Sequence, residues 1–355
     1  MFFFVKQGGV TLGPSFLGHS TKFIEKVFPA KERSALDTLT FFGFMLFIFL
    51  SGVKIDPTIT FRSGRRTCAV GILGYFVPYI LAKVVFYILT HSTSFDKEVS
   101  TMMAIVIEVQ CIVAFPVITC FLSEHQILNS EIGRLATASS LVTETCFILN
   151  MTLTFFIKLT LTKSIVVSTG SFLSAVLLVF FVIFVVHPAA VWAIQQSPEG
   201  KPVQEIYIFG VLITLMLCGL IGEIIGINAI VVSFFIGLAI PDGPPLGAAL
   251  VDKLDCFVSV VCLPMLFIIV GLRTNVYAIQ TMNNILGILI IICTTFCGKI
   301  LGALVPLLYL RMPIRDAFAL GCIMNIKGTV EMALLTDLKL RDVSKFFNSN
   351  ARYNL

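Results

Sequence analysis

The stretch with the strongest chemical signal in this sequence is Glu131–Met151, EIGRLATASSLVTETCFILNM. It predicts a membrane helix that carries one carboxylate, Glu144, near its middle. Ser140, Thr137 and Gly133 precede Glu144 at helical spacing, so small and polar residues share a stripe with the carboxylate. A carboxylate at bilayer depth costs about 2.5–3.5 kcal/mol on insertion scales, so it usually faces a partner or a water-filled cavity. The stretch therefore predicts an ion or proton site. The alternative is a remnant carboxyl that stays protonated and has no function.

Lysines in other apolar segments are candidates for the same chemistry. Lys299 lies centrally between Ile285 and Leu310, and a buried ammonium needs a counter-ion or must lose its proton. We expect Glu144 to be that counter-ion. Lys327 has Glu331 four residues further on, so a local helical pair would neutralise both, and this pair is the alternative to a role in transport.

The remaining charges in apolar segments give weaker signals. Lys83 and Lys158 lie near segment ends, where we expect them to extend to the membrane surface. Glu223 falls at a segment junction and is expected to be interfacial, whereas Glu108 has no partner that the sequence can assign. No catalytic triad pattern, phosphate loop or metal motif is present, so we expect neither an enzyme nor a cofactor, and no metal beyond a transported cation. The scattered cysteines lack zinc-site spacing, which predicts reduced thiols that pack as small apolar residues.

The elements that position these groups follow from composition. Of the 355 residues, 57% are hydrophobic and only 13% are charged, about half the charged share of soluble domains. The mean hydropathy is +0.98. These values predict an all-α, multi-pass integral membrane protein whose main partner is the lipid bilayer. The net charge of +5 is ordinary for such a protein and does not indicate nucleic-acid binding.

A series of apolar segments is close to the ~20 residues that cross a bilayer, and with a short Gly/Pro-rich segment at 8–18 it gives about eleven crossings. The boundary between the two segments that flank Glu223 is weak. We assign 1–337 to the transmembrane domain and 338–355 to a short polar tail. Lysines and arginines mark both sides of the membrane, which leaves the orientation open. The predicted spans are 36–53, 67–90, 101–122, 133–160, 171–194, 206–222, 225–240, 256–272, 284–310 and 316–336.

Two predicted spans are interrupted. Pro116 lies inside 101–122, where it removes a backbone hydrogen bond and frees carbonyl groups. Asn325, Lys327 and Gly328 interrupt 316–336 with polar and flexible residues. Interruptions in both halves of a chain are typical of transporters built from inverted repeats, whose sites lie at broken helices near the membrane midplane.

Several motifs together resemble the plant cation/proton exchangers of the monovalent cation:proton antiporter-2 superfamily. The first are GGVTLGPSFLG (8–18) and FPVITCFLSEHQILNSEIGRLATASSLVTET (115–145). They are followed by INAIVVSFFIGLAIPDGPPLGAALVDKLDCFVSVVCLPMLFIIVGLRTNV (227–276), GKILG (298–302) and MNIKGTVEM (324–332). The resemblance covers nearly the whole chain, and the motifs keep the family's order and spacing.

The resemblance implies a sodium/proton-antiporter-like inverted-repeat bundle with broken crossing helices, divided into a core domain and a dimerisation domain. It implies exchange of a monovalent cation, typically K⁺ but also Na⁺, for H⁺ by alternating access. The membrane would be a plant endomembrane or the plasma membrane, and a homodimer is possible.

The resemblance also identifies site residues. The family's Asn-Asp pair, which binds the ion or proton, corresponds to Thr143 and Glu144, and its two lysines are kept as Lys299 and Lys327. Ser140, Pro116, Asn325 and Glu331 are expected to support this site. Hydroxyl residues that the family often has near the crossing point are replaced by Cys111 and Val113.

Two departures from the family pattern lead to a second hypothesis. The family has a further helix before GGVTLGPS and a long hydrophilic region after the last span, whereas this chain appears truncated at both ends. A truncated gene model, a splice form or a degenerate paralogue would each account for this. The alternative function is therefore a protein that inserts in the membrane but does not transport.

Overall fold

The computed structural model describes residues 30–54, 64–93, 95, 97–162, 165–196, 203–225, 227–241, 243–273, 282–328, 331 and 334–335. Regular secondary structure within these ranges is entirely helical, which confirms the predicted all-α class. The Gly/Pro-rich segment 8–18 and the predicted tail 338–355 lie outside the described residues. All ten cysteines are free thiols, as the sequence predicts.

The chain forms two compact units that alternate along the sequence. The first unit includes the described residues of Ser20–Thr58 and Ile148–Ile269, and the second includes those of Ile59–Phe147 and Val270–Leu355. The helix α8 (Glu131–Thr162) contributes its first half to the second unit. Because every predicted site residue belongs to the second unit, the site can be described within that unit alone.

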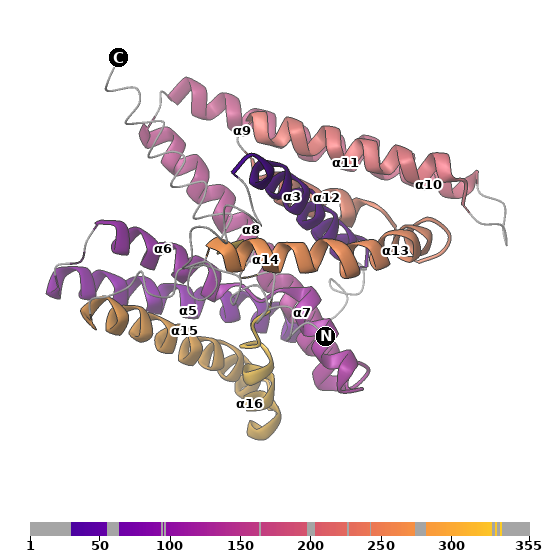
Figure 1. Cartoon of the computed structure of the whole chain (residues 1–355). Coiled ribbons are helices and arrows are strands. Elements are labelled where there is room, and N and C mark those ends of the chain that lie inside the picture. The colour runs from indigo at the N-terminus through magenta and orange to yellow at the C-terminus, as the bar shows by residue number, and fades with distance from the viewer. Residues whose placement is uncertain are drawn as a thin grey trace, which may run out of the picture. The chain divides into compact units, whose positions relative to one another are not determined.

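In the first unit, α3 packs along α12 and α9 contacts α11 (Figure 1). The predicted span 171–194 is one continuous rod in which a π-helical turn joins α9 to α10. The core of the first unit is apolar and includes Leu46, Phe49, Leu215 and Ile236. The elements are α3 (Ala30–Val53), the second half of α8, α9 (Ile165–Phe181), η2 (Val182–Val186), α10 (His187–Gln195), α11 (Glu205–Ile225), α12 (Ala229–Ala239), α13 (Leu246–Phe257), η3 (Val258–Cys262) and the part of α14 (Leu263–Arg273) that ends at Ile269.

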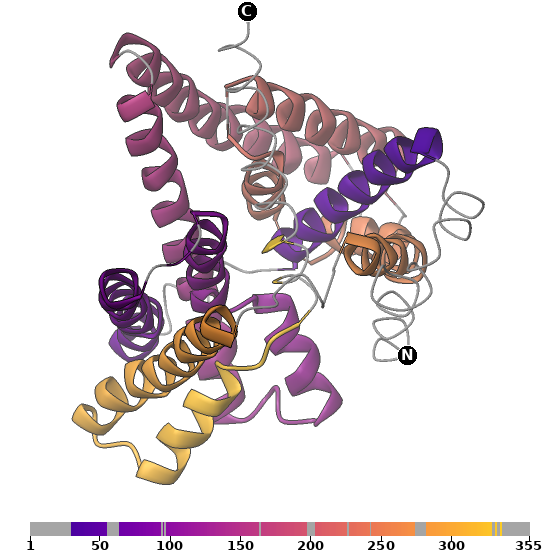
Figure 2. The ribbon, with the colours of Figure 1, turned by 60° about the vertical axis from the view of Figure 1, so that its left-hand side comes forward.

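In the second unit, α5 and α15 lie side by side, and α16 returns beside the end of α15 (Figures 1 and 2). Gly298 and Gly302 flank Lys299 on the face of α15 that touches α5. A β-carbon on Gly302 would lie 2.6 Å from the carbonyl oxygen of Leu73, so only glycine allows this approach. The elements are α5 (Gly64–Ser92), α6 (Lys97–Cys111), α7 (Phe115–Glu124), the first half of α8, α15 (Met282–Tyr309) and α16 (Ile314–Ile323).

We expect Gly302→Ala to lower the melting temperature, because the added methyl group would meet the α5 backbone and must push the helices apart. Overpacking of this kind typically destabilises by about 1–3 kcal/mol. Gly210→Ala is the matched control, since a β-carbon there meets nothing within 4 Å. Thermal unfolding of both purified variants in detergent would check the prediction. Equal melting temperatures for the two variants would contradict the close α5–α15 contact.

Most predicted spans fall on helices, but the span predicted at 256–272 is part of a helical stretch that already begins at Leu246 with α13. Six described helices are long and apolar enough to cross a membrane, or seven if the bent pair α6–α7 is one span. The weak boundary near Glu223 is a real break, because α11 ends at Ile225 and Asn228 caps α12 by accepting a hydrogen bond from Ile230 N at 2.9 Å. Glu223 also accepts from Ala229 N at 3.0 Å. The protein is thus an integral, multi-pass membrane protein, and the total of about eleven crossings stays a prediction.

Candidate ion-binding site

The break predicted at Pro116 is present between α6 and α7. α6 ends at Cys111, residues 112–114 are not helical, and α7 begins at Phe115 with its axis bent by 49° from that of α6. Proline is well suited to the first turn of a helix, where its missing N–H would have no helical partner. The break leaves the C-terminus of α6 and the N-terminus of α7 without helical continuation, and three residues of the chain lie between them.

The second predicted break is also present. α16 ends at Ile323, and residues 324–328 leave the helical conformation. Asn325 donates its side-chain amide to Gly321 O at 3.0 Å and more weakly to Phe296 O of α15 at 3.4 Å. Asn325 therefore satisfies a carbonyl at the end of α16 and connects this end to α15. This contact supports the helix end and does not by itself bind an ion.

Lys327 brings the two breaks together. Its ammonium donates to the carbonyl oxygens of Val109, Gln110 and Ile112, at 3.1, 2.9 and 2.7 Å. Lys299 reaches the same place from α15 and donates to Ile112 O at 2.7 Å. Carbonyl groups in the last turn of a helix have no helical donor and carry partial negative charge. The two lysines therefore neutralise the end of α6, and Lys299 does so while only 1% exposed.

Glu144 lies at the other side of the same break. Its Oε2 accepts a hydrogen bond from Phe115 N, the first residue of α7, at 3.2 Å. The side chain is only 5% exposed. A helix N-terminus presents free N–H groups with partial positive charge, so a carboxylate is favoured there. The break thus has a carboxyl side chain at its N–H end and two lysine side chains at its carbonyl end.

Neighbouring polar residues hold α8 in place. The hydroxyl of Thr143 lies 3.1 Å from Gly71 O on α5 and 2.9 Å from Ser139 O, so its single hydrogen is directed at backbone carbonyls. Ser140 donates to Thr137 O at 2.7 Å within α8. These bonds give both hydroxyls an anchoring role, and the role of Thr143 as an ion ligand stays a prediction.

The direct pair predicted between Glu144 and Lys299 is not formed in this structure. Both residues are described, and neither a hydrogen bond nor an ion pair joins them. The reason is that each charge has a closer backbone partner: Phe115 N for the carboxylate and Ile112 O for the ammonium. Their backbone partners are close in the chain, because Ile112 is the first residue of the three-residue break and Phe115 is the residue that follows it.

Lys327 and Glu331 form the predicted ion pair, but their charged atoms lie at the long end of the range for such a pair. Glu331 Oε1 lies 4.0 Å from Lys327 Nζ, and Glu331 Oε2 accepts a hydrogen bond from Gly328 N at 2.8 Å. The Glu331 side chain is buried, with an exposure of 4%. Cys111 and Val113, which replace the hydroxyl residues of the family pattern, are fully buried beside the break and offer no oxygen ligand.

A polar cluster in the same unit was missed by the sequence analysis. Lys83 was expected to extend to the membrane surface and Glu108 had no assigned partner, but Lys83 Nζ lies 3.2 Å from Glu108 Oε1. The hydroxyl of Tyr79 donates to the same oxygen at 3.1 Å. These contacts join α5 to α6 directly before the carbonyls that accept from the lysines, because Glu108 is the residue before Val109. The side chain of Lys158 lies outside the described part of the chain.

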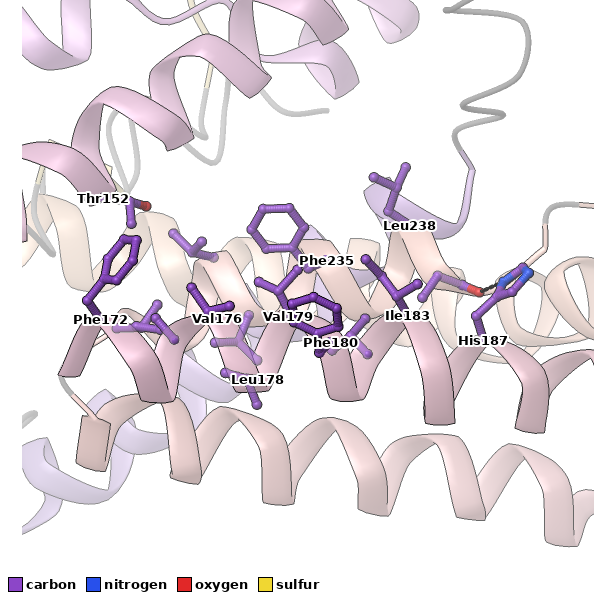
Figure 3. Close-up of a pocket in the computed structure, with 16 residues that line it drawn as sticks. Thr152, Phe172, Val176, Leu178, Val179, Phe180, Ile183, His187, Phe235 and Leu238 are labelled. Carbon is purple, nitrogen blue, oxygen red and sulfur yellow. Dashed lines mark hydrogen bonds between the residues drawn. The ribbon is translucent and has the colours of Figure 1, made fainter. Parts of the chain in front are cut away.

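The first unit contains a pocket of about 550 Å³ that has a different character (Figure 3). α9, η2 and α12 line it with apolar side chains such as Phe172, Phe180 and Phe235. His187 lies at one end and forms a hydrogen bond of 2.7 Å with Ala239 O, drawn as the dashed line in Figure 3. Asp, Glu, Lys and Arg are missing from the described lining, so this pocket does not suit an ion.

The sequence also matches a known protein family. The profile described as "Sodium/hydrogen exchanger, transmembrane" matches residues 8–348. The chain belongs to this exchanger family. Its similarity to Arabidopsis thaliana proteins also confirms the predicted resemblance to plant cation/proton exchangers.

Three relatives illustrate the range within the exchanger family. The chain is 35% identical to Cation/H(+) antiporter 18 of Arabidopsis thaliana over 337 residues, which are 95% of this chain and 41% of that protein. It is 33% identical to Cation/H(+) antiporter 15, over 96% of this chain and 41% of that protein. It is also 33% identical to Cation/H(+) symporter 13, over 91% of this chain and 39% of that protein. The chain thus spans about two fifths of the length of these relatives.

Proposed function

We propose that this protein exchanges a monovalent cation, K⁺ or Na⁺, for H⁺ across a plant membrane by alternating access, and that both ions compete for Glu144. The observation that carries this proposal is the position of Glu144. It is a buried carboxylate on the free N-terminus of α7, inside a break whose other end holds two lysines. A carboxylate at such depth without a titratable or ionic function would be costly to maintain.

Competition for one carboxylate explains coupling between the two fluxes. A proton neutralises Glu144 covalently, and a bound cation neutralises it electrostatically, so holding one ion weakens the binding of the other. If the site switches between the two sides of the membrane more readily when Glu144 holds a proton or a cation than when it is empty, each transport cycle moves one ion in each direction. The N–H of Phe115 keeps the empty carboxylate satisfied, which allows the cycle to pass through that state.

The lysines have a supporting role in this mechanism. Lys327 and Lys299 fix the end of α6 through its carbonyls, so the two half-helices keep a constant geometry around Glu144. Their positive charge also lies in the same buried region as the carboxylate.

Names within the family support a cation/H⁺ transporter but leave the direction of coupling open, because one relative is named a symporter. We therefore test direction first. The purified chain is inserted in vesicles that contain K⁺ and a pH-sensitive dye, and the vesicles are diluted into K⁺-free buffer. Antiport acidifies the interior as K⁺ leaves, which is the result the proposal predicts. Symport would make the interior more alkaline, and either that result or the absence of any K⁺-driven pH change would contradict the proposed exchange.

A second candidate is a protein that inserts but does not transport. It is favoured by the replacement of oxygen-bearing residues near the break with Cys111 and Val113, both fully buried. It is also favoured by the Thr143 hydroxyl, whose hydrogen is directed at backbone carbonyls. Silent vesicles with confirmed insertion would support this candidate. A homodimer and the particular plant membrane stay predictions.

A further inference from the structure

One carboxylate oxygen near Lys327, Oε1 of Glu331, has no hydrogen-bond donor among the described residues. An ammonium group has three N–H donors, and those of Lys327 are directed at the carbonyls of Val109, Gln110 and Ile112. Glu331 Oε1 lies 4.0 Å from Lys327 Nζ, too far for a hydrogen bond. Among the described residues, this oxygen accepts no hydrogen bond although it is buried.

The other oxygen of Glu331 shows that this carboxylate is held in place. Oε2 accepts from Gly328 N at 2.8 Å, three residues earlier in the chain, which fixes the orientation of the group. An oriented, buried carboxylate oxygen with no donor is rare in folded proteins, and an ion or a water that occupies the site in the working molecule is one explanation for it. The exposure of 4% leaves little room for bulk solvent as that partner.

Glu331 belongs to the same electrostatic environment as the proposed transport site. Its Oε1 lies 4.0 Å from Nζ of Lys327, which binds Ile112 O in the α6–α7 break, and Glu144 accepts from Phe115 N at the other end of the same break. The two ammonium groups share one carbonyl oxygen, Ile112 O, and would repel a further cation that approached Glu144. A single carboxylate offsets the repulsion from two ammonium groups poorly. Two carboxylates balance the charge of both lysines, so an exchangeable cation can bind without that repulsion.

We propose that Glu331 Oε1 is an oxygen ligand of the transported monovalent cation and makes the site a two-carboxylate site together with Glu144. The proposal rests on the proposed exchange function, which names Glu144 alone as the coupling group. Its chemistry is ordinary for K⁺ and Na⁺, which bind oxygen atoms. The free Oε1 of Glu331 supplies such an atom without breaking the Gly328 hydrogen bond.

Glu331→Gln separates this role from a purely structural one. The amide oxygen of glutamine can still accept from Gly328 N, so the local backbone contact survives while the charge is lost. The purified chain in detergent is titrated with KCl or NaCl, with choline chloride as the inert salt, and the melting temperature is recorded. We expect wild type to be stabilised by K⁺ or Na⁺, and the half-saturating concentration to rise by at least about tenfold in Glu331→Gln.

Two further variants complete the design. Glu131→Gln removes an exposed carboxylate from α8 and should keep the wild-type cation dependence. Glu331→Asp keeps the charge but draws it back, so we expect cation dependence to persist with an altered preference between Na⁺ and K⁺. If Glu331→Gln does not fold, Glu331→Asp tests the proposal instead, because a purely structural role of Glu331 would not change the preference between Na⁺ and K⁺.

The outcomes distinguish the two proposals. A wild-type half-saturating concentration in Glu331→Gln, or an unaltered ion preference in Glu331→Asp, would overturn the role of Glu331. If Glu144→Gln alone removes the cation dependence, the proposed function stands without this inference. A wild-type protein with neither cation-dependent stabilisation nor exchange would overturn both.

Discussion

Glu144→Gln is expected to reduce K⁺-driven proton flux in vesicles to the level of protein-free vesicles. Glutamine has nearly the same shape and can still accept from Phe115 N through its amide oxygen, so the contact between α8 and the start of α7 is kept. It can neither release a proton nor balance a bound cation with a negative charge. Because the proposed coupling consists of competition for that charge, removal of the charge removes exchange in both directions.

Two companion variants make this prediction specific. Glu131→Gln, on the same helix but with a side chain 74% exposed, should keep normal flux. Glu144→Asp keeps a carboxylate but shortens the side chain, so the 3.2 Å contact with Phe115 N is lost and we expect slower but measurable exchange. Normal flux in Glu144→Gln would show that another group couples the two ions.

Lys327→Met is expected to cause the largest loss of stability among the site variants. Lys327 donates three hydrogen bonds to carbonyls at the end of α6, and a hydrogen bond that involves a charged group contributes roughly 1.5–3 kcal/mol. Without the ammonium, two of these carbonyls have no donor that the described part of the chain supplies. We expect destabilisation by about 3 kcal/mol or more, read as a lower melting temperature of the purified protein.

The matched comparisons for this prediction are two other lysines. Lys299→Met removes one hydrogen bond, with Ile112 O, and should lower the melting temperature less than Lys327→Met. Lys54→Met breaks an ion pair with Asp255 whose side chains are 43% and 46% exposed, and such exposed pairs contribute only about 0–1 kcal/mol. If Lys54→Met and Lys327→Met were equally stable, the proposed fixing of the α6 end would be wrong.

The parts of the site that the sequence predicts are those that local chemistry determines. Proline cannot continue a hydrogen-bonded helix, so Pro116 marks the first break, and Asn325 to Gly328 marks the second. Helical spacing likewise places Glu144 and Ser140 on a common stripe. Long apolar segments give the membrane helices nearly residue by residue, as for α5 and the predicted span 67–90.

The partners of the buried charges could not be predicted in the same way. Lys299 and Lys327 bind backbone carbonyls, and every residue has a carbonyl, so no side-chain pattern marks Ile112 as their acceptor. A search for opposite charges therefore suggested Glu144 as the partner of Lys299, which the structure does not bear out. The pair of Lys83 and Glu108 was missed because helical spacing gives the face of each helix but not which helix packs against it.

The most direct test of the account is proton release on cation binding. K⁺ or Na⁺ is added to the purified protein in weakly buffered detergent solution, and the pH change is followed with a dye, with choline as the inert salt. If one carboxylate holds either a proton or a cation, wild type should release protons in a saturable way and Glu144→Gln should release far fewer. Equal release from both proteins, or none from wild type while the cation binds, would contradict Glu144 as the shared site.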